Sequence, residues 1–304
     1  MPEPYQEPLL GKDGTRQPLL PTVALGDLRL TRLIIGGNPF CGMAHFSGDL
    51  GAEMLDYFTM EQLKRVLFEC ERQGINAMVM RGDAFIRRLV REYRRDGGGL
   101  QWIVQTASEF ADQPGHVRSL ASAAAAIYHH GTRTDNHWIA RNMEPVRELL
   151  AVMRDTGRPI GLATHIPEVI QHAEERGWDL DFYMASAYCV ARKYRQSALV
   201  SGVDTSAEEI YDDADRERML DTVAACAKPC LVFKILGASR KCENPEMVRE
   251  TFRHIFARIK PSDAVVVGMF PKHRNQVAEN AALVREMTAE ACHSEAKPRN
   301  PGIL

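Results

Sequence analysis

The fold predicted for this chain depends on one stretch, Ile127-Tyr128-His129-His130-Gly131-Thr132-Arg133-Thr134-Asp135. A run of mostly alanine, from Ala121 to Ile127, leads into two adjacent histidines, and Gly131 then releases the chain into a polar loop. Such a pattern is typical of a buried parallel strand that ends at the mouth of a barrel. The stretch from Ile160 to Glu168 has the same form and includes His165. We therefore expect the two strand ends to face a common site.

Strands and amphipathic helices alternate along the rest of the chain. The count predicts an α/β protein, a (β/α)₈ TIM barrel over residues 22–292 that forms a single domain, with a short hairpin at its N-terminus. A doubly wound sheet is the alternative, but no GxGxxG follows the first strand. Residues 1–21 are expected to form a flexible arm, 188–213 an insertion long enough to be a lid, and 293–304 a disordered tail. The expected strands are 33–37, 75–81, 100–106, 124–128, 160–164, 180–185, 230–236 and 264–268, and a basic helix is expected over 84–95.

Composition narrows the classes of function. Hydrophobic residues make up 45% of the chain and charged residues 26%, which is ordinary for a globular protein with a full core. The net charge of -2 gives no electrostatic reason to expect nucleic acid or membrane as a partner. No apolar run approaches the ~20 residues of a membrane span, and no signal-peptide pattern is present. Seven cysteines without a CxxC pair favour reduced thiols in a cytoplasmic protein.

Both ends of the chain resemble the aldo-keto reductase superfamily. Leu25 to Gly37 resembles the N-terminal hairpin and first strand of that family, and Gly74-Ile75-Asn76 resembles the entry to its second strand. Val265 to Asn280 resembles its last strand and the Glu-Asn opening of its last helix. The similarity runs from about residue 25 to 286 and is weak in the middle. It implies an aldo-keto reductase type of TIM barrel and a divergent member of the superfamily.

The resemblance fails at the catalytic residues. That family uses an Asp and a Tyr at the second strand, a Lys at the third and a His at the fourth, with the Tyr donating a proton as hydride arrives. Here the corresponding positions fall on Val79, on Ala84 or Phe85 and on Gln105, and the histidine alone persists, as His129 or His130. The resemblance therefore implies the fold and argues against the usual reduction mechanism.

The expected cofactor side is also altered. Counting back from Glu279 and Asn280, the positions that hold the 2′-phosphate of NADP in that family become Phe270, Pro271 and Gln276. Arg240, Lys272 and Arg274 lie near the expected phosphate pocket and could substitute, or they could be solvated residues at helix starts. Reduction with NAD(P)H, with His130 as the proton donor, is thus one hypothesis.

A second hypothesis is a metal site. Neutral imidazoles with a carboxylate suit Zn²⁺, Fe²⁺ or Mn²⁺. The candidate ligands are His45, His130, His165 and Glu168, with Asp83 as an alternative carboxylate. Glu168 also has a structural interpretation, because Pro167 is expected to start a helix and a carboxylate favours the positive end of that helix.

A third hypothesis is acid/base or imine chemistry around Lys234. In strand seven, Phe233 and Ile235 are expected to face the helices, which would point Lys234 into the barrel. In strand six, the same alternation sends Phe182 and Met184 outward. A buried Lys could form an imine or stabilise an enolate while a histidine moves the proton. The structural alternative is an ion pair of Lys234 with Asp181 or Asp83.

Together these patterns predict an enzyme for a small polar, sugar-like molecule with carbonyl or hydroxyl groups. The favoured chemistry is lyase, isomerase or hydrolase action at the barrel mouth, assisted by a divalent metal if one binds. An NAD(P)H-dependent oxidoreductase and a non-catalytic ligand-binding barrel are the alternatives, and a homo-oligomer is left open. The candidate catalytic residues are His130, His165, Lys234, Asp83 and Tyr188.

Overall fold

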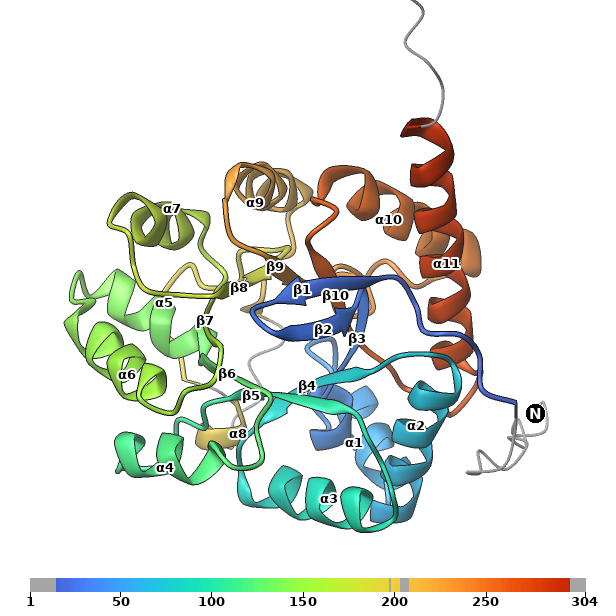
Figure 1. Cartoon of the computed structure of the whole chain (residues 1–304), viewed down its shortest axis with the longest axis horizontal. Coiled ribbons are helices and arrows are strands. Elements are labelled where there is room, and N and C mark those ends of the chain that lie inside the picture. The colour runs from blue at the N-terminus through green and yellow to red at the C-terminus, as the bar shows by residue number, and fades with distance from the viewer. Residues whose placement is uncertain (1–14, 197, 203–207, 296–304) are drawn as a thin grey trace, which may run out of the picture.

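A closed barrel of eight parallel strands forms the centre of the computed structural model, which describes residues 15–196, 198–202 and 208–295. The strands are hydrogen-bonded in the order β10-β3-β4-β5-β6-β7-β8-β9, which confirms the predicted TIM barrel. Figure 1 shows the ring of helices around these strands. The barrel strands are β3 (Leu33–Gly36), β4 (Ala77–Arg81), β5 (Gln101–Gln105), β6 (Ala126–His129), β7 (Ile160–Thr164), β8 (Phe182–Ser186), β9 (Cys230–Phe233) and β10 (Ala264–Gly268).

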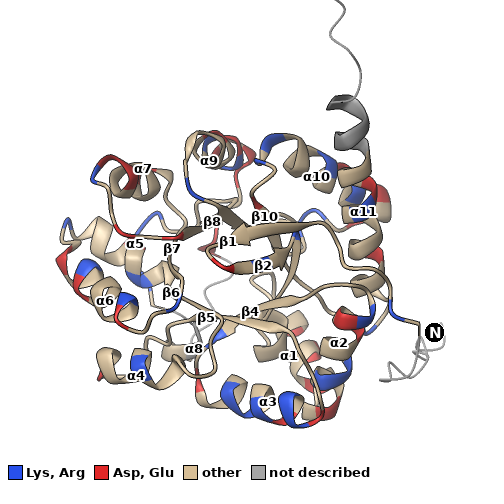
Figure 2. Ribbon diagram, in the orientation of Figure 1, with Lys and Arg blue, Asp and Glu red and all other residues tan. Residues whose placement is uncertain are grey.

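Amphipathic helices cover the outside of the barrel. Their apolar faces pack on the outward side chains of the strands, and their charged faces lie in solvent, as Figure 2 shows for the basic helix α3. Among the described residues, no helix has the length and apolar character needed to cross a bilayer. The helices are α1 (Gly48–Tyr57), α2 (Met60–Arg72), α3 (Ala84–Arg95), α4 (Gln113–Leu120), α5 (Gly131–Ile139), α6 (Glu144–Arg154), α7 (Pro167–Glu175), α8 (Ala198–Ser201), α9 (Asp213–Ala225), α10 (Pro245–Arg258) and α11 (Gln276–Glu295), with a 3₁₀ turn η1 at Asn38–Cys41.

The predicted hairpin closes one end of the barrel. Strands β1 (Thr22–Leu25) and β2 (Leu28–Thr31) pair antiparallel around Gly26, and Figure 1 shows them lying across the ring. Apolar side chains of the hairpin join the interior cluster at the first residues of the barrel strands. The opposite end, where the strands finish, is therefore the open one.

The N-terminal arm is fixed over part of its length. Residues 1–14 and 296–304 lie outside the described residues, but Gln17 and Leu20 donate backbone hydrogen bonds to Arg72 and Gly74. Leu20 is 1% exposed. The arm predicted for 1–21 is therefore docked from Gln17 onward, and α11 extends to Glu295, past the predicted start of the tail at residue 293.

The side chains of β8, the sixth barrel strand, face the opposite way from the prediction. Phe182 and Met184 belong to the barrel interior, whereas Tyr183 and Ala185 pack under the helices. The interior has room for the Phe182 ring because residue 161 is glycine, and a Cβ there would lie 2.5 Å from Phe182 Cζ. For β7, the fifth barrel strand, the prediction was right, because Ile160 and Leu162 face the helices.

Candidate active site

A cavity of about 1060 Å³ opens at the carboxyl ends of the barrel strands. Its floor includes interior residues such as Tyr128 and Ala163, and its sides include α1, η1 and the first turns of α11. In TIM barrels this end is where functional side chains gather, because strands from all sides deliver their terminal residues to it. The predicted residues that line this cavity are His45, His130, His165, Lys234, Arg274, Glu279 and Asn280.

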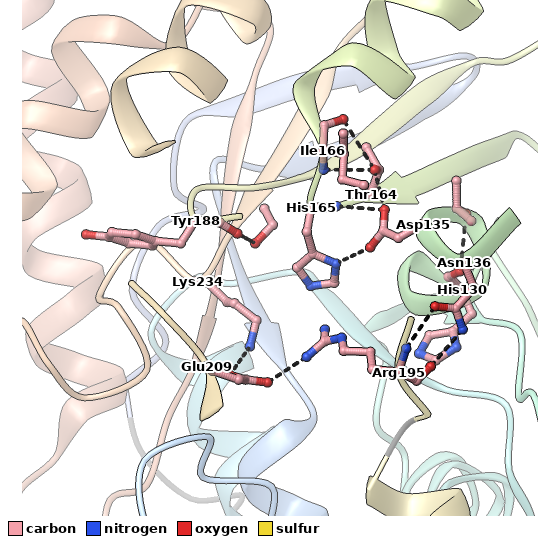
Figure 3. A network of polar contacts seen from close by, with 12 residues as sticks. His130, Asp135, Asn136, Thr164, His165, Ile166, Tyr188, Arg195, Glu209 and Lys234 are labelled. Atoms are coloured by element: carbon pink, nitrogen blue, oxygen red, sulfur yellow. Dashed lines mark hydrogen bonds and ion pairs between the residues drawn. The ribbon is translucent and has the colours of Figure 1, made fainter. Parts of the chain in front are cut away.

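His165 is held by a buried carboxylate. Asp135 accepts a hydrogen bond from His165 Nδ1 at 2.6 Å, from Thr164 Oγ1 at 2.6 Å and from the backbone N–H of His165 at 3.2 Å. Figure 3 shows this arrangement, with the other edge of the imidazole turned to the cavity. Because Asp135 accepts at Nδ1, the neutral ring carries its proton there and presents the lone pair of Nε2.

The local environment keeps His165 neutral. Burial lowers the pKa of His165, Asp135 partly offsets this effect, and the cations of Arg195 and Lys234 lower the pKa further. A neutral imidazole with a free Nε2, positioned by a carboxylate, is the arrangement that general bases use. His165 can therefore accept a proton from a molecule in the cavity.

Of the two adjacent histidines, His130 faces the cavity. Its Nδ1 is buried without a partner among the described residues. Burial, together with Arg81, lowers the pKa of His130 well below its usual value, so the ring is neutral. His129 turns to the helix side, where its Nδ1 lies 2.7 Å from Thr134 Oγ1.

Lys234 reaches the cavity by a different route from the predicted one. Phe233 lines the cavity instead of facing the helices, so simple alternation would send Lys234 outward. Strand β9 ends at Phe233, and Lys234 has a left-handed backbone with φ 60°, which returns its side chain to the mouth. A non-glycine residue in this region is strained by about 1–3 kcal/mol, and such strain is concentrated at functional sites.

The partner of Lys234 is also different from the predicted one. Its Nζ donates to Tyr211 Oη at 3.2 Å and lies 4.0 Å from Glu209 Oε2, whereas Asp181 is paired with Arg154. Burial lowers the pKa of Lys234 to about 8, although Glu209 acts in the opposite direction. Lys234 is therefore a cation at neutral pH that can lose its proton just above it.

Part of the insertion forms one wall of the site. Glu209 accepts hydrogen bonds from His45 Nδ1 at 2.9 Å, Arg195 Nη1 at 2.7 Å and Tyr211 Oη at 2.7 Å. Burial raises the pKa of Glu209, but the hydrogen bonds from His45 and Tyr211 and the charge of Lys234 outweigh it and hold that pKa well below its usual range. Burial lowers the pKa of His45 to about 4.

Sequence reasoning missed Arg195 and Glu209 as site residues, and it placed Asp135 near the mouth after the fourth strand without giving it a role. Asp135 lies in the stretch that the sequence suggests is a loop, but that stretch is helix α5, and the fifth residue of α5 faces β7. A helical signal was available, because Thr134 and Asp135 are followed by the apolar pair Trp138 and Ile139. For Glu209, no local pattern distinguishes it from its acidic neighbours.

Three residues predicted as catalytic or as metal ligands do not reach the cavity. Asp83 caps α3 by accepting from the Ile86 N–H at 2.9 Å and pairs with Arg81, so it positions an arginine that does line the cavity. Tyr188 donates to Asp213 at 3.2 Å on the far side of the strand end, and Figure 3 shows it pointing away. Glu168 is half exposed and pairs with Arg218 at the surface, because it sits in the first turn of α7.

The predicted metal ligands are not brought together. Glu168 pairs with Arg218 at the outer surface, outside the cavity that the three histidines line. In the described ranges, no three His, Cys, Asp or Glu side chains are grouped so that they could hold a metal ion. The set of His45, His130, His165 and Glu168 is therefore wrong as a metal centre.

The predicted phosphate-binding cations already have partners within the protein. Lys272 Nζ lies 2.8 Å from Glu53 Oε1, and Arg274 Nε lies 2.9 Å from Glu279 Oε1. Arg240 stacks 4.1 Å from the centre of the Tyr211 ring and donates to the His45 carbonyl at 2.9 Å. These residues do not fit the 2′-phosphate of NADP, because each basic group has a carboxylate or structural partner.

Charge divides the cavity into two parts. Among the described residues, the charged side chains that line the barrel-mouth part are Arg81, Arg195, Lys234 and Glu209. Arg81 is itself paired with Asp83 and Glu109. The part between α1, α10 and α11 is lined by more carboxylates than cations. The mouth is thus the part that suits an anionic molecule. The charged side chains of the second part are Glu53, Glu246, Glu279, Glu286, Arg249 and Arg274.

Comparison with known proteins supports the fold alone. The chain matches no family model and no curated protein. A truncated 3-deoxy-D-arabino-heptulosonate 7-phosphate synthase from Thermotoga maritima is similar in structure, with a TM-score of 0.54, 15% identity, and 92% of this chain and 95% of that chain covered. A phospho-2-dehydro-3-deoxyheptonate aldolase of the same organism gives a TM-score of 0.52 at 13% identity, covering 92% of this chain and 75% of that chain. The protein is thus a (β/α)₈ barrel with a polar cavity at its open end, and membership of the aldo-keto reductase superfamily stays a hypothesis.

Proposed function

We propose that the protein is an enzyme that moves a proton on a small polar molecule bearing carbonyl and hydroxyl groups. The observation that carries this proposal is the 2.6 Å contact of His165 Nδ1 with the buried Asp135, which leaves Nε2 facing the cavity. Proton transfer next to a carbonyl is common to isomerases and lyases. The proposal therefore keeps a reaction class favoured by the sequence, retains His165 and Lys234 from the predicted catalytic set and omits Asp83 and Tyr188.

The roles follow from the protonation states. His165 Nε2 takes a proton from the carbon next to the carbonyl group, and the electron pair of that C–H bond moves onto the carbonyl oxygen. The ammonium group of Lys234 stabilises that negative charge, which is the largest contribution in many enzymes of this kind. Return of the proton to a neighbouring carbon gives an isomer, and loss of a leaving group gives an elimination product.

Deuterium exchange tests this proposal even before the substrate is identified. The wild-type protein is incubated in D₂O with a panel of small hydroxy-carbonyl compounds and hydroxy acids, and incorporation at carbon is followed by NMR. We expect exchange with at least one compound, and its loss in His165→Gln. Exchange that persists in His165→Gln would remove His165 as the base, and an absence of exchange across the panel would contradict the proposed reaction class.

The alternative reaction, reduction by NAD(P)H, has less support. Two of the three cations proposed for the phosphate, Lys272 and Arg274, are paired with carboxylates, and acidic residues outnumber basic ones beside α11. We therefore expect no change in protein fluorescence when NADPH or NADH is titrated to millimolar concentration. Saturable quenching with either cofactor would restore the oxidoreductase hypothesis.

A further inference from the structure

Two polar groups at the barrel mouth have no hydrogen-bond partner among the residues that the structure describes. In the described part of the chain, Arg195 Nε and His130 Nδ1 are buried without a hydrogen bond. The other two such atoms, on Gln113 and His116, belong to the first turns of α4, away from the mouth. Because buried polar groups are nearly always paired in folded proteins, an unpaired group that lines a cavity marks a contact reserved for something else.

The free edge of Arg195 has a defined geometry. Its backbone is fixed by Asn136, which donates to the Arg195 carbonyl at 2.7 Å and accepts from the Arg195 N–H at 3.1 Å. Of the guanidinium nitrogens of Arg195, only Nη1 donates a hydrogen bond to Glu209, at 2.7 Å. This leaves Nε and Nη2 without a partner among the described residues, and these two parallel N–H groups form the edge that binds a carboxylate in a bidentate manner.

His130 supplies a second contact in the same cavity. Its ring is neutral, so one nitrogen can donate a hydrogen bond and the other can accept one. Figure 3 shows His130 beside the Arg195 segment, on the opposite side of the mouth from Lys234. The unpaired Nε–Nη2 edge of Arg195 favours a ligand with an anionic group over a neutral one.

We infer that the substrate is a hydroxy acid whose carboxylate binds the Nε–Nη2 edge of Arg195 and accepts a further hydrogen bond from His130. This inference rests on the proposed function, because it names the substrate class for the same site. It places the carboxylate at one side of the mouth. A carbonyl group of the substrate, separate from the carboxylate, then lies near Lys234, and His165 moves the proton on the carbon next to it.

Binding of matched acids and neutral analogues tests the substrate class. Gluconate, galactonate, lactate and glycerate are titrated against the wild-type protein by calorimetry, beside glucitol, galactitol, propanediol and glycerol as uncharged counterparts. Inorganic phosphate is the competing anion. We expect at least one acid to bind at least 10-fold more tightly than its neutral counterpart. Equal affinities, no binding of any acid at 10 mM, or tighter binding of phosphate would each overturn the inference.

Substitutions at the two contacts test the geometry. Arg195→Lys keeps the charge beside Glu209 but removes the bidentate edge, so acid affinity should fall roughly 10- to 100-fold. Arg192→Lys changes an arginine of the same insertion that pairs with Asp215, and it should leave affinity unchanged. His130→Asn keeps a nitrogen near the position of Nδ1 and should bind better than His130→Gln. An unchanged affinity in Arg195→Lys with an intact thermal transition would rule the contact out.

His165→Gln separates this inference from the proposed reaction. If that variant binds the acid normally but does not exchange deuterium, both the carboxylate site and the base assignment hold. If the wild type binds acids in an Arg195-dependent manner without exchange, the carboxylate site stands and the proposed reaction fails. Deuterium exchange on neutral compounds alone would support the proposed reaction and contradict the carboxylate-binding site.

Discussion

A single buried carboxylate determines which nitrogen of His165 meets the cavity. Asp135 is 0% exposed, and three donors surround it, two of them from His165 itself. The cost of burying this charge is offset by the short hydrogen bonds to Thr164 and to the imidazole. The same contacts that stabilise the carboxylate therefore also orient the base.

Asp135→Asn should slow deuterium exchange by roughly 10²- to 10⁴-fold, the usual contribution of a positioned general base. Asp135 raises the pKa of His165, so the acid limb of the rate profile should move to lower pH. The rate is measured by NMR between pH 4 and 8, with the exposed Asp221→Asn as the control. An unchanged rate and an unmoved limb in Asp135→Asn would show that the pair is only structural.

In our proposal, loss of the proton from Lys234 sets the upper pH limit of deuterium exchange. Its pKa of about 8 means that the ammonium group is present below that pH and is lost above it. Exchange should therefore fall above about pH 8. Lys234→Arg should retain some activity and lose this basic limb, because a guanidinium stays charged. A limb that remains in Lys234→Arg belongs to another group, and a borohydride-trapped adduct at Lys234 would indicate imine chemistry instead.

At the scale of elements, helix α5 connects the barrel to the insertion. Asp135 on this helix orients His165, and its neighbour Asn136 holds the backbone of Arg195 through two reciprocal hydrogen bonds. The insertion in turn brings Glu209 and Tyr211 to Lys234. A substitution in α5 should therefore affect residues on both sides of the cavity.

Asn136→Ala should loosen the insertion without unfolding the barrel. Two hydrogen bonds of about 0.5–1.5 kcal/mol each are lost, so local opening should become roughly 5- to 100-fold more frequent. Limited trypsin digestion followed by mass spectrometry should show faster cleavage after Lys193 and Arg195. Asn142→Ala removes a similar bond at the start of α6 and is the control. Equal cleavage in the two variants would argue against the clamp.

At the scale of the whole molecule, the barrel buries histidines in their neutral form. Burial lowers the pKa of His45 and of His116 to about 4 and that of His129 to about 3, and it also lowers the pKa of His130 and His165. An unfolded histidine has a pKa of about 6.5. Between these values the unfolded chain binds protons that the folded chain does not, so stability is present above pH 6.5 and is lost as the pH falls toward 4.

The thermal midpoint should therefore fall steeply between pH 6.5 and pH 4. Each buried histidine contributes up to about 1.4 kcal/mol per pH unit to that slope. Calorimetry in buffers of different ionisation enthalpy should detect proton uptake on unfolding at pH 5. His129→Gln should reduce this uptake by close to one proton, and the exposed His273→Gln is the comparison. A midpoint that is flat over this range would contradict the buried neutral state.

The sequence by itself determined the barrel and the place of the site. Strands β7 and β10 and helix α3 begin and end at the predicted residues. The spacing of apolar residues and the glycines that flank such segments are local features, so the sequence alone is enough to predict them. The hairpin was predictable for the same reason. The meeting of His130 and His165 at one cavity follows from the topology, since both residues come directly after parallel strands.

Only the tertiary structure decided how these residues are used. Asp135 rather than Glu168 partners His165 because α5, not α7, turns its polar face to the end of β7. Lys234 enters the cavity through a left-handed backbone that strand alternation cannot predict. Glu209 arrives from an insertion whose path no local pattern encodes. Periodicity specifies which elements form, but hydrogen-bond partners depend on how distant elements pack, and that is fixed only when the whole barrel is closed.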